Sequence, residues 1–319
     1  MAEISIIIPC YNASDYIKKC LDSIERQSYR DFDVHLVDDC SSDNTVDVLK
    51  GITSNYGYSI FIHQNQVNKG PSLSRLVGIR SSNAKYLAFC DSDDVIERDF
   101  LLKLFEKIRE GNEIAFCNYY VVHSNGKKSE RMWFSKKENL NIRKLIAMGP
   151  DSMCCLLVEK KIFENIVFPD LRNGEDMALI PVLISKANKI GYVNDCLYNY
   201  MYRTNSLSKR IDPELSKSLL ISFNYILDNI SKEYEVEREF LGIRNYLYGS
   251  LINIFKIKNI NNELVMEIIY KFERIYPKWE NNKYFNCLPI YKKIFLFFVK
   301  KRKFVLCRTF ATIHSILTV

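Results

Sequence analysis

The sequence predicts an α/β fold: a mostly parallel sheet flanked by helices, followed by a C-terminal helical region. In the first half, short continuous apolar runs suit strands that are buried on both faces, and the segments between them show helical spacing of apolar residues. Alternation of this kind requires right-handed crossovers between parallel strands. After residue 213, long helical patterns with few glycines replace the strand-like runs.

Four strands alternate with three helices in the first hundred residues. The expected strands are 4–9, 32–37, 59–63 and 85–90, and the expected helices are about 14–27, 44–50 and 72–81. Ser14 or Asp15 is the candidate N-cap of the first helix.

The pattern is less regular from residue 98 onward. It predicts helices near 98–109, 136–147 and 174–186, strands near 113–122 and 153–159, a polar loop at 124–129 and a strand pair over 192–202. Helical spacing then covers 215–230, 240–257, 263–276 and 290–299. We therefore expect two domains, a sheet domain over 1–210 and a helical region over 211–319.

The composition is that of a folded globular protein. Of 319 residues, 47% are apolar and 26% are charged, so we do not expect disorder. The net charge of +7 is uneven, because residues 211–319 contain 17 Lys and Arg against 11 Asp and Glu. A partner that favours positive charge would therefore bind the C-terminal third.

Cysteine usage and hydropathy predict a reduced, cytoplasmic protein. The ten cysteines form no CxxC pair and several lie within apolar runs, which fits buried thiols better than disulfides or a zinc site. The N-terminus lacks the pattern of a signal peptide. The longest apolar run, 294–299, is far shorter than a membrane span.

The most informative motif is KYLAFCDSDDVIE at 85–97. A buried strand is followed directly by Asp91, Asp93 and Asp94. Carboxylates this close raise each other's pKa unless a cation neutralises them, and their hard oxygen atoms suit Mg²⁺ or Mn²⁺. A strand end followed by an acidic helix N-cap is the alternative interpretation.

Polar residues also follow the neighbouring strands. The first strand leads into Pro9-Cys10-Tyr11-Asn12, and the second leads into Asp38-Asp39. Open α/β sheets bind ligands beyond the carboxyl ends of their strands, so we expect Tyr11, Asp39 and Asp93 in one crevice. There a carboxylate can accept the N–H of a uracil ring, Tyr11 can lie against the base, and a metal at Asp93 can meet the diphosphate. Helix capping is the alternative role of the second pair.

Two common phosphate-binding motifs are absent from the sequence. No GxGxxG or GxxxxGK[ST] follows the first strand, so dinucleotide-binding and P-loop functions lose their main support. Arg75 in the third helix can reach a phosphate, although a solvated arginine is an equal alternative.

The chain closely resembles family-2 inverting glycosyltransferases of the GT-A fold, which is Rossmann-like. The resemblance covers roughly residues 3–205 and rests on ISIIIPCYNASDYIKKCLDSIERQSYRDFDVHLVDDCSSDNT and NKGPSLSRLVGIRSSNAKYLAFCDSDD, in that order. Several motifs in the correct order are more specific than any one of them.

The resemblance implies roles for the residues at the strand ends. Pro9, Tyr11 and Asp39 match the uracil pocket, with Asn12 and Asp38 beside them. Asp91-Ser92-Asp93 matches the DxD motif, in which the first aspartate faces the ribose and sugar and the second holds the metal. Asp94 matches a further acidic position that approaches the donor sugar. The metal-binding candidates are therefore Asp93 and Asp91, with Mn²⁺ or Mg²⁺ as the cofactor.

Three later matches complete the implied site. Arg75 matches the arginine of the ARNxG segment, although Leu76 stands where asparagine is common. Glu175-Asp176 matches a later Glu-Asp motif whose aspartate acts as the catalytic base; in isolation, this dipeptide is more often a capping device. Residues 202–208, with Arg203, resemble a segment that can close over the diphosphate.

The implied activity is the inverting transfer of a hexosyl or N-acetylhexosaminyl group from a UDP-sugar donor to a glycan acceptor. The expected acceptor is lipid-linked, within O-antigen or capsule biosynthesis. Two alternatives are a glycan-binding scaffold with a degenerate transferase domain and a sugar nucleotidyltransferase. The latter would require a glycine-rich basic loop after the first strand, which CYNASDY does not supply.

The C-terminal region has a second pattern. Nine Lys and Arg but one acid, Glu280, lie between Pro277 and Arg308, interleaved with aromatic residues. A basic helix with an aromatic face can lie on the inner surface of the plasma membrane. A helical bundle with an aromatic core, or a homo-oligomer interface, is the equal alternative. We expect no nucleic-acid partner, because the sheet half supplies no such module.

Overall fold

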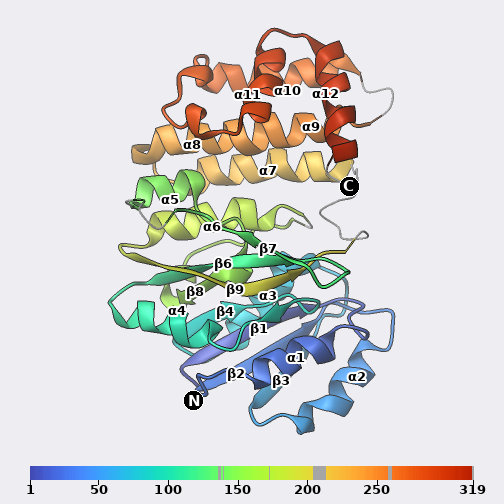
Figure 1. Ribbon diagram of the computed structural model, residues 1–319, viewed down its shortest axis with the longest axis vertical. Helices are drawn as coiled ribbons and strands as arrows, with labels where there is room; N and C mark the ends of the chain where they lie inside the picture. Colours follow the sequence, from blue (N-terminus) through green and yellow to red (C-terminus); the bar gives the residue numbers. More distant parts are fainter. Residues whose placement is uncertain (136–137, 139, 172, 204–212, 258–260, 318–319) are drawn as a thin grey trace. The chain divides into compact units, whose positions relative to one another are not determined.

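The computed structural model describes residues 1–135, 138, 140–171, 173–203, 213–257 and 261–317 (Figure 1). The chain forms two compact units. Unit 1 consists of Met1–Arg172 and Leu183–Thr204, and unit 2 consists of Asn173–Val182 and Asn205–Val319.

Unit 1 is built on a nine-stranded sheet in the described part of the chain. The strand order is β3-β2-β1-β4-β8-β6-β9-β5, and β7 pairs with β6 (Figure 1). The first four positions in this order are parallel strands: β1 (Ile4–Cys10), β2 (Phe32–Asp38), β3 (Ser59–Gln64) and β4 (Tyr86–Phe89). The remaining strands are β5 (Val95–Ile96), β6 (Ile114–Val122), β7 (Lys128–Arg131), β8 (Leu156–Glu159) and β9 (Ile190–Met201).

The second half of the sheet mixes directions. β8 runs antiparallel to both β4 and β6, whereas β6 and β9 are parallel. The short strands β5 and β7 add antiparallel pairs to β9 and β6. The sheet is therefore parallel where the sequence alternates strand and helix, and mixed where that alternation stops.

Helices cover both faces of the parallel half, which explains its continuous apolar runs. Helix α3 (Gly70–Ser81) packs so closely on one face that a Cβ atom on Gly78 would lie 2.5 Å from Cγ2 of Ile7. Helix α1 (Ile17–Glu25) lies on the opposite face, where Sγ of Cys20 is 3.6 Å from Sγ of Cys90. A strand covered on both sides is apolar at most positions, and the buried Ser5 of β1 has hydrogen-bond partners in Asp33 and Ser82.

The other helices of the first 190 residues are short. They are α2 (Thr45–Ile52), α4 (Phe100–Arg109), α5 (Ile142–Met148) and α6 (Glu175–Lys186), with 3₁₀ turns η1 (Thr53–Asn55), η2 (Met153–Cys155) and η3 (Lys160–Phe163). The four predicted strands of the first hundred residues and the helices between them are confirmed to within a few residues.

Two local predictions were wrong. Residues 192–201 form part of one long strand, β9, rather than a strand pair, and a register shift beside Asn118 accommodates its polar middle. The residue before α1 is Tyr16, which makes no side-chain cap, and Ser14 donates a hydrogen bond to Asp43 instead of capping the helix. The predicted loop at 124–129 is confirmed as the turn of the β6–β7 hairpin, although β7 already begins at Lys128.

The described part of unit 2 after residue 212 is helical. It contains α7 (Pro213–Asn229), η5 (Lys232–Tyr234), α8 (Glu235–Leu241), the π-helix η6 (Gly242–Ser250), α9 (Leu251–Ile254), α10 (Asn262–Ile275), η7 (Trp279–Asn281), η8 (Phe285–Cys287), α11 (Ile290–Lys300) and α12 (Phe304–Leu317). Its core is aromatic: the rings of Phe223 and Phe272 lie 5.5 Å apart. Gly242 packs against both rings, which leave no room for a Cβ atom at position 242. None of the helices in the described ranges has both the length and the apolar content needed to cross a bilayer.

Candidate active site

The candidate site begins at the edge of unit 1 where β1, β2 and β4 end. The parallel register pairs Cys10 with Asp38 and Ile7 with Phe89, so the residues that follow these strands leave the sheet on the same side. Tyr11, directly after β1, has an exposed fraction of 51%, which leaves its ring accessible to a ligand.

The loop after β1 is fastened to the loop after β2. Asn12 has a positive φ of 50°, a conformation that asparagine tolerates better than most residues. Its Oδ1 accepts a 2.9 Å hydrogen bond from the backbone amide of Ser42, and the backbone amide of Asn12 donates to Oγ of Ser41 at 3.0 Å. Asn12 therefore holds Tyr11 in place through the second loop.

Asp39 joins the end of β2 to the start of α3. Its buried carboxylate accepts hydrogen bonds from the amides of Lys69 at 2.9 Å and Gly70 at 2.7 Å, and from Nδ2 of Asn65 at 2.8 Å. A carboxylate is favoured at a helix N-terminus, where backbone amides carry partial positive charge. Asp39 is thus a buried anchor with fixed partners.

Asp38 has a different environment although it is equally buried. Its Oδ2 accepts a 3.3 Å hydrogen bond from the amide of Ser41. Its Oδ1 is buried with no hydrogen-bond partner among the described residues. Because a buried carboxylate oxygen without a donor is costly, this atom is suited to accept a hydrogen bond from a ligand.

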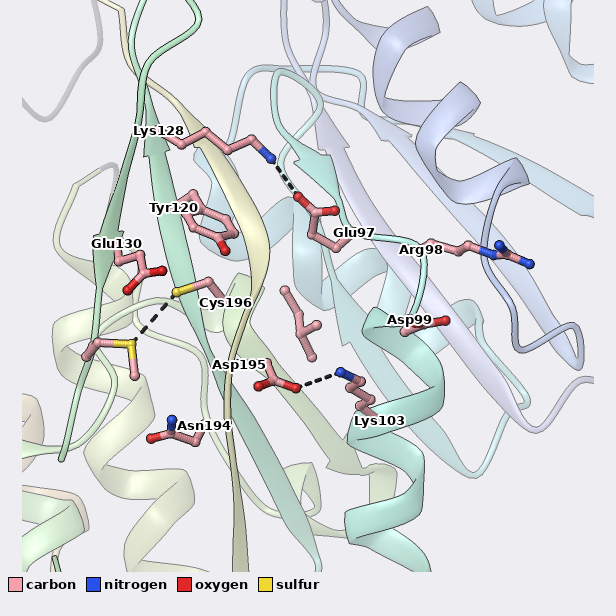
Figure 2. Close-up of a pocket in the computed structure, with 12 residues that line it drawn as sticks. Glu97, Arg98, Asp99, Lys103, Tyr120, Lys128, Glu130, Asn194, Asp195 and Cys196 are labelled. Atoms are coloured by element: carbon pink, nitrogen blue, oxygen red, sulfur yellow. Dashed lines mark hydrogen bonds and ion pairs between the residues drawn. The ribbon is translucent and has the colours of Figure 1, made fainter. Parts of the chain in front are cut away.

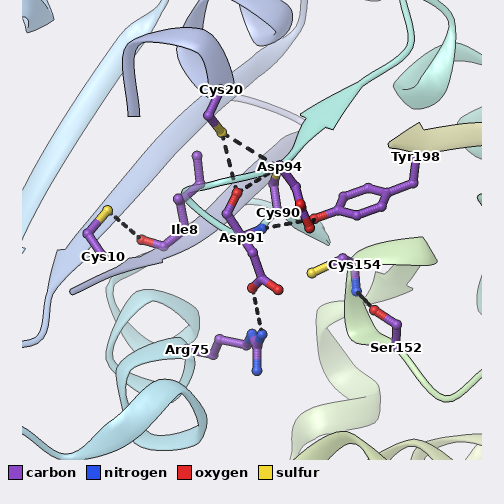
Figure 3. A network of polar contacts seen from close by, with 10 residues as sticks. All are labelled: Ile8, Cys10, Cys20, Arg75, Cys90, Asp91, Asp94, Ser152, Cys154 and Tyr198. Carbon is purple, nitrogen blue, oxygen red and sulfur yellow. Dashed lines mark hydrogen bonds and ion pairs between the residues drawn. The ribbon is translucent and has the colours of Figure 1, made fainter. Parts of the chain in front are cut away.

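Three aspartates gather at the end of β4. One carboxylate oxygen from each of Asp91, Asp93 and Asp94 lies within 4.8 Å of the others. Two guanidinium groups stand against them: Nη2 of Arg75 is 2.8 Å from Oδ1 of Asp91 (Figure 3), and Arg203 forms an ion pair with Asp93. The side chains of Asp91 and Asp93 are 38% and 39% exposed, so both can reach a ligand.

Asp94 points the other way, into the protein. Its Oδ2 accepts a 2.6 Å hydrogen bond from the hydroxyl of Tyr198 (Figure 3). Its Oδ1 accepts one from the backbone amide of Met201 at 2.7 Å. Burial, and then the negative charge of Asp91, raises the pKa of Asp94 to about 8. Only 2% of Asp94 is exposed, so its observed contacts are structural.

The donor set at this edge fits a hard divalent cation. Asp91 and Asp93 present carboxylate oxygens, the ligands that Mg²⁺ and Mn²⁺ prefer. Both oxygens of Asp94 already have protein donors. The residues suited to hold a metal are therefore Asp93 and Asp91, with the small Ser92 between them.

Arg203 bridges the cluster and helix α1. Its guanidinium carbon lies 3.8 Å from the centre of the Tyr16 ring while its nitrogen contacts Asp93. Stacking on the ring fixes the orientation of the planar guanidinium group. Of the segment predicted at 202–208, residues 204–208 lie outside the described residues.

Glu175 and Asp176 belong to unit 2. They form the first turn of α6, after Gly174, whose φ of 74° suits glycine. The carbonyl oxygen of Gly174 accepts a 3.2 Å hydrogen bond from Ser222 of α7, and Asp176 is half-buried. The other predicted site residues lie in unit 1, at or after the ends of β1, β2, β4 and β9, except Arg75, which lies in α3.

Two contributors were missed by the sequence interpretation. Tyr198 accepts a hydrogen bond from the amide of Asp91 at 3.2 Å while donating to Asp94, and Tyr16 stacks on Arg203. Tyr16 lies at the end of the loop that joins β1 to α1. A search for aromatic residues in the loops that follow strands would have included it together with Tyr11. No local signal marks Tyr198, because its partners are more than 100 residues earlier.

A separate depression in unit 1 lies around the β6–β7 hairpin and β9, with a volume of about 590 Å³ (Figure 2). Its polar groups are largely paired with one another. Lys128 lies 2.7 Å from Glu97, and Lys103 lies 2.6 Å from Asp195. None of the predicted site residues is among those that line it.

Comparisons with known proteins agree with this arrangement. The profile described as Glycosyl transferase family 2 matches residues 5–167. Glycosyltransferase GlyA of Streptococcus pneumoniae serotype 4 is 29% identical in an alignment of 272 positions that covers 79% of this chain and 38% of GlyA. A poly(ribitol-phosphate) beta-glucosyltransferase of Bacillus spizizenii is 29% identical in an alignment of 211 positions that covers 63% of this chain and 32% of the relative. The chain therefore spans about a third of the length of these relatives.

A solved structure matches nearly the whole chain. The crystal structure of S. aureus TarS 1-349 in complex with UDP-GlcNAc has a TM-score of 0.74 and 21% identity, and the match covers 98% of this chain and 91% of that one. At this identity the similarity establishes the fold. The predicted GT-A fold followed by a helical region is confirmed.

Proposed function

Since the chain belongs to glycosyl transferase family 2, we propose that it transfers a sugar, with inversion, from a UDP-linked donor to a hydroxyl group of a glycan acceptor. The observation that carries the proposal is the end of β4, where two half-exposed carboxylates and two guanidinium groups meet. The match to a TarS structure that contains UDP-GlcNAc supports a UDP-sugar donor.

The donor nucleotide would be recognised beyond β1 and β2. Asp38 offers a buried Oδ1 to the N–H of the uracil ring, and Tyr11 offers an exposed ring for stacking against the base. Pro9, near the end of β1, would line the uracil pocket, and Asn12 fixes the loop that follows the strand. Asp39 was expected to contact the uracil, but its carboxylate is already saturated by protein donors, so we propose that it acts indirectly, by holding the start of α3 and thereby the position of Arg75.

The sugar and diphosphate would lie beside the β4 cluster. A divalent cation held by Asp93 and Asp91 supplies positive charge for the leaving diphosphate when it is bound. Arg75 and Arg203 are positively charged like the cation, and both are held near these carboxylates. Arg203 must release Asp93 when the cation binds, and it is then available to a phosphate oxygen.

Asp176 is the proposed catalytic base. As an acceptor hydroxyl forms a bond to the anomeric carbon, the bond from that carbon to the diphosphate oxygen breaks and Asp176 accepts the hydroxyl proton. Proton transfer of this kind contributes about 10²–10⁴-fold to a rate. A single displacement inverts the anomeric configuration, so an α-linked donor gives a β-linked product.

The proposed acceptor is a lipid-linked glycan in the synthesis of a bacterial surface polysaccharide, at the cytoplasmic face of the membrane. The poly(ribitol-phosphate) beta-glucosyltransferase among the relatives supports a cell-surface polymer as the acceptor class. The other sequence-based assignments, an O-antigen or a capsule repeat, are narrower versions of the same proposal.

The test is a panel of UDP-sugars assayed for slow hydrolysis with Mn²⁺, Mg²⁺ or a chelator. We expect one sugar to be hydrolysed faster than the others, and only with a divalent cation. Mn²⁺-dependent binding of UDP without turnover of any sugar would instead favour a glycan-binding scaffold. Release of diphosphate from a nucleoside triphosphate and a sugar phosphate would identify a nucleotidyltransferase.

Asp176→Asn separates chemistry from binding. We expect UDP-sugar affinity to stay at the wild-type value and transfer to fall by about 10²–10⁴-fold. Glu267→Gln, which removes one charge from an exposed position of α10, is the control. Normal transfer by Asp176→Asn would assign the base to another residue.

A further inference from the structure

Helix α11 exposes an apolar face. Phe295, Leu296 and Val299 are fully buried, as expected for the inner side of a surface helix. The outer side should then be polar, but Ile290 is 69% exposed and Phe297 is 57% exposed. Ile294 lies between them at helical spacing and is 42% exposed.

Helix α12 repeats this arrangement and packs on α11. Phe310 of α12 contacts Phe295 of α11, with ring centres 5.5 Å apart. Away from this contact, Val305 is 77% exposed, and Leu306 and Ile313 are 45% and 52% exposed. Two adjacent helices therefore present large aliphatic and aromatic side chains to solvent. Several large apolar side chains exposed on two packed helices favour a binding surface.

The charge around these helices has one sign. Residues 281–319 contain eight Lys and Arg and no Asp or Glu. Some of these basic side chains pair with glutamates of other elements: Nζ of Lys300 lies 3.1 Å from a carboxylate oxygen of Glu280, and Arg302 forms an ion pair with Glu273. Lys301 and Lys303 are exposed in the turn between α11 and α12, beside the apolar side chains.

We propose that the outer faces of α11 and α12 bind the surface of an anionic lipid bilayer, with Ile294 and Phe297 entering the headgroup region and Lys301 and Lys303 contacting lipid phosphates. Apolar side chains flanked by lysine are the features that hold a helix in the plane of a membrane interface. A second copy of the chain would bring the same positive charge against itself. An anionic surface complements that charge.

The test is co-sedimentation of the full chain with vesicles of equimolar phosphatidylcholine and phosphatidylglycerol, with pure phosphatidylcholine vesicles as the reference. We expect binding to the anionic vesicles only, and loss of that binding at high salt. Neither UDP nor a divalent cation is present, so the result does not depend on the proposed transferase activity.

Two pairs of substitutions separate the contribution of the apolar side chains to vesicle binding from that of the lysines. Ile294→Ser with Phe297→Ser should lower the partition constant at least about tenfold, because the apolar contact is lost. Lys301→Glu with Lys303→Glu should lower it by a similar factor, about tenfold or more. Tyr270→Ser, at a 63% exposed position of α10, and Lys232→Glu, at an exposed position of η5, are the matched controls and should bind as the wild type does.

The proposal is overturned if the wild type does not sediment with the anionic vesicles, or if both pairs of substitutions leave sedimentation unchanged. It is also overturned if the wild type self-associates in analytical ultracentrifugation and the serine pair abolishes only that association. Circular dichroism verifies folding. If the serine pair does not fold, the lysine pair decides the outcome, because both lysines are exposed.

Discussion

Aspartates stand at the end of β2 and in the loop after β4, but the two groups are built differently. After β2, Asp39 is buried and its carboxylate is saturated by amide donors from the start of α3. After β4, Asp91 and Asp93 are half-exposed and face the side chains of two arginines. Backbone amides cannot leave their positions, whereas a guanidinium on a side chain can move aside.

The difference separates scaffold from ligand site. A carboxylate with fixed amide partners positions the elements that carry those amides, here the loop before α3. A carboxylate with exchangeable counter-charges can accept a cation without unfolding its surroundings. Asp94 shows that both kinds occur within one motif, because it lies one residue from Asp93 and yet is locked by Tyr198.

Asp93→Asn is the strongest test of this contrast. Mutation of residues that only support a metal ligand costs about 10–100-fold in affinity, so loss of a ligand should reduce Mn²⁺-dependent UDP binding at least about 100-fold. Thermal stability should change little, because the side chain is partly exposed. Isothermal titration calorimetry with and without Mn²⁺ measures the effect, and retained metal-dependent binding would place the cation elsewhere.

Asp39→Asn should give the opposite result. The amide side chain cannot accept from both backbone donors at once, so one buried donor loses its partner at a cost of about 1–3 kcal/mol in the free energy of unfolding. Urea denaturation measures this cost. An unchanged unfolding midpoint would show that the hydrogen bonds to Lys69 and Gly70 do not stabilise the fold.

The pH dependence of stability distinguishes Asp94 from its neighbours. Its pKa is raised from 3.8 to about 8 in the folded protein, mainly by burial. The folded state therefore holds a proton that the unfolded state releases, and stability falls as the pH rises through this window and is level above it. For the metal-free protein the slope from this group is at most about 1.4 kcal/mol per pH unit.

Asp94→Asn removes this titration and should flatten the dependence. The measurement is the free energy of unfolding at several pH values across the window, in a chelating buffer. An identical slope in Asp94→Asn and the wild type would assign the pH dependence to another group.

Arg203→Ala should have the smallest effect. Without its guanidinium, Asp93 is already free to bind a cation, so Mn²⁺ affinity in the absence of UDP should rise by roughly fivefold, the scale of a partly exposed ion pair. Arg203→Lys keeps a positive charge and should remain close to the wild type. Titration with Mn²⁺ monitored by electron paramagnetic resonance measures the change, and lower affinity in the alanine variant would contradict the competition.

The parallel half of the sheet could be predicted because its strands are buried on both faces. Ile4–Cys10, apart from Ser5, and Tyr86–Phe89 are apolar runs of strand length, and the alternation of such runs with helical patterns favours parallel strands. The strand Val95–Ile96 was missed because two residues are too few to show a period, and Lys128–Arg131 was missed because it is mostly exposed and has no apolar face. In β9, the polar residues Asn194 and Asp195 suggested a turn where the structure has a register shift.

The candidate site was predictable only in its local parts. The spacing of Asp91 and Asp93 directly after a strand-like apolar run is sufficient by itself to identify a carboxylate cluster. The inward orientation of Asp94 depends on Tyr198, more than 100 residues later, and on the way β9 passes β5. Likewise, the sequence could not decide whether the aromatic residues of α11 form an exposed face or a core, because both give the same helical spacing; the structure exposes Phe297 and buries Phe295.

The close approach of α3 to the sheet has a consequence for engineering. Arg75 lies less than one helical turn before Gly78, and the Arg75–Asp91 contact depends on how near that helix lies to β1. A methyl group at position 78 would press on Ile7, a side chain too rigid and too enclosed to yield, so the helix itself must shift outward. Gly78→Ala thus offers a way to adjust catalytic electrostatics by steric displacement alone, while every charged residue of the cluster stays in the sequence.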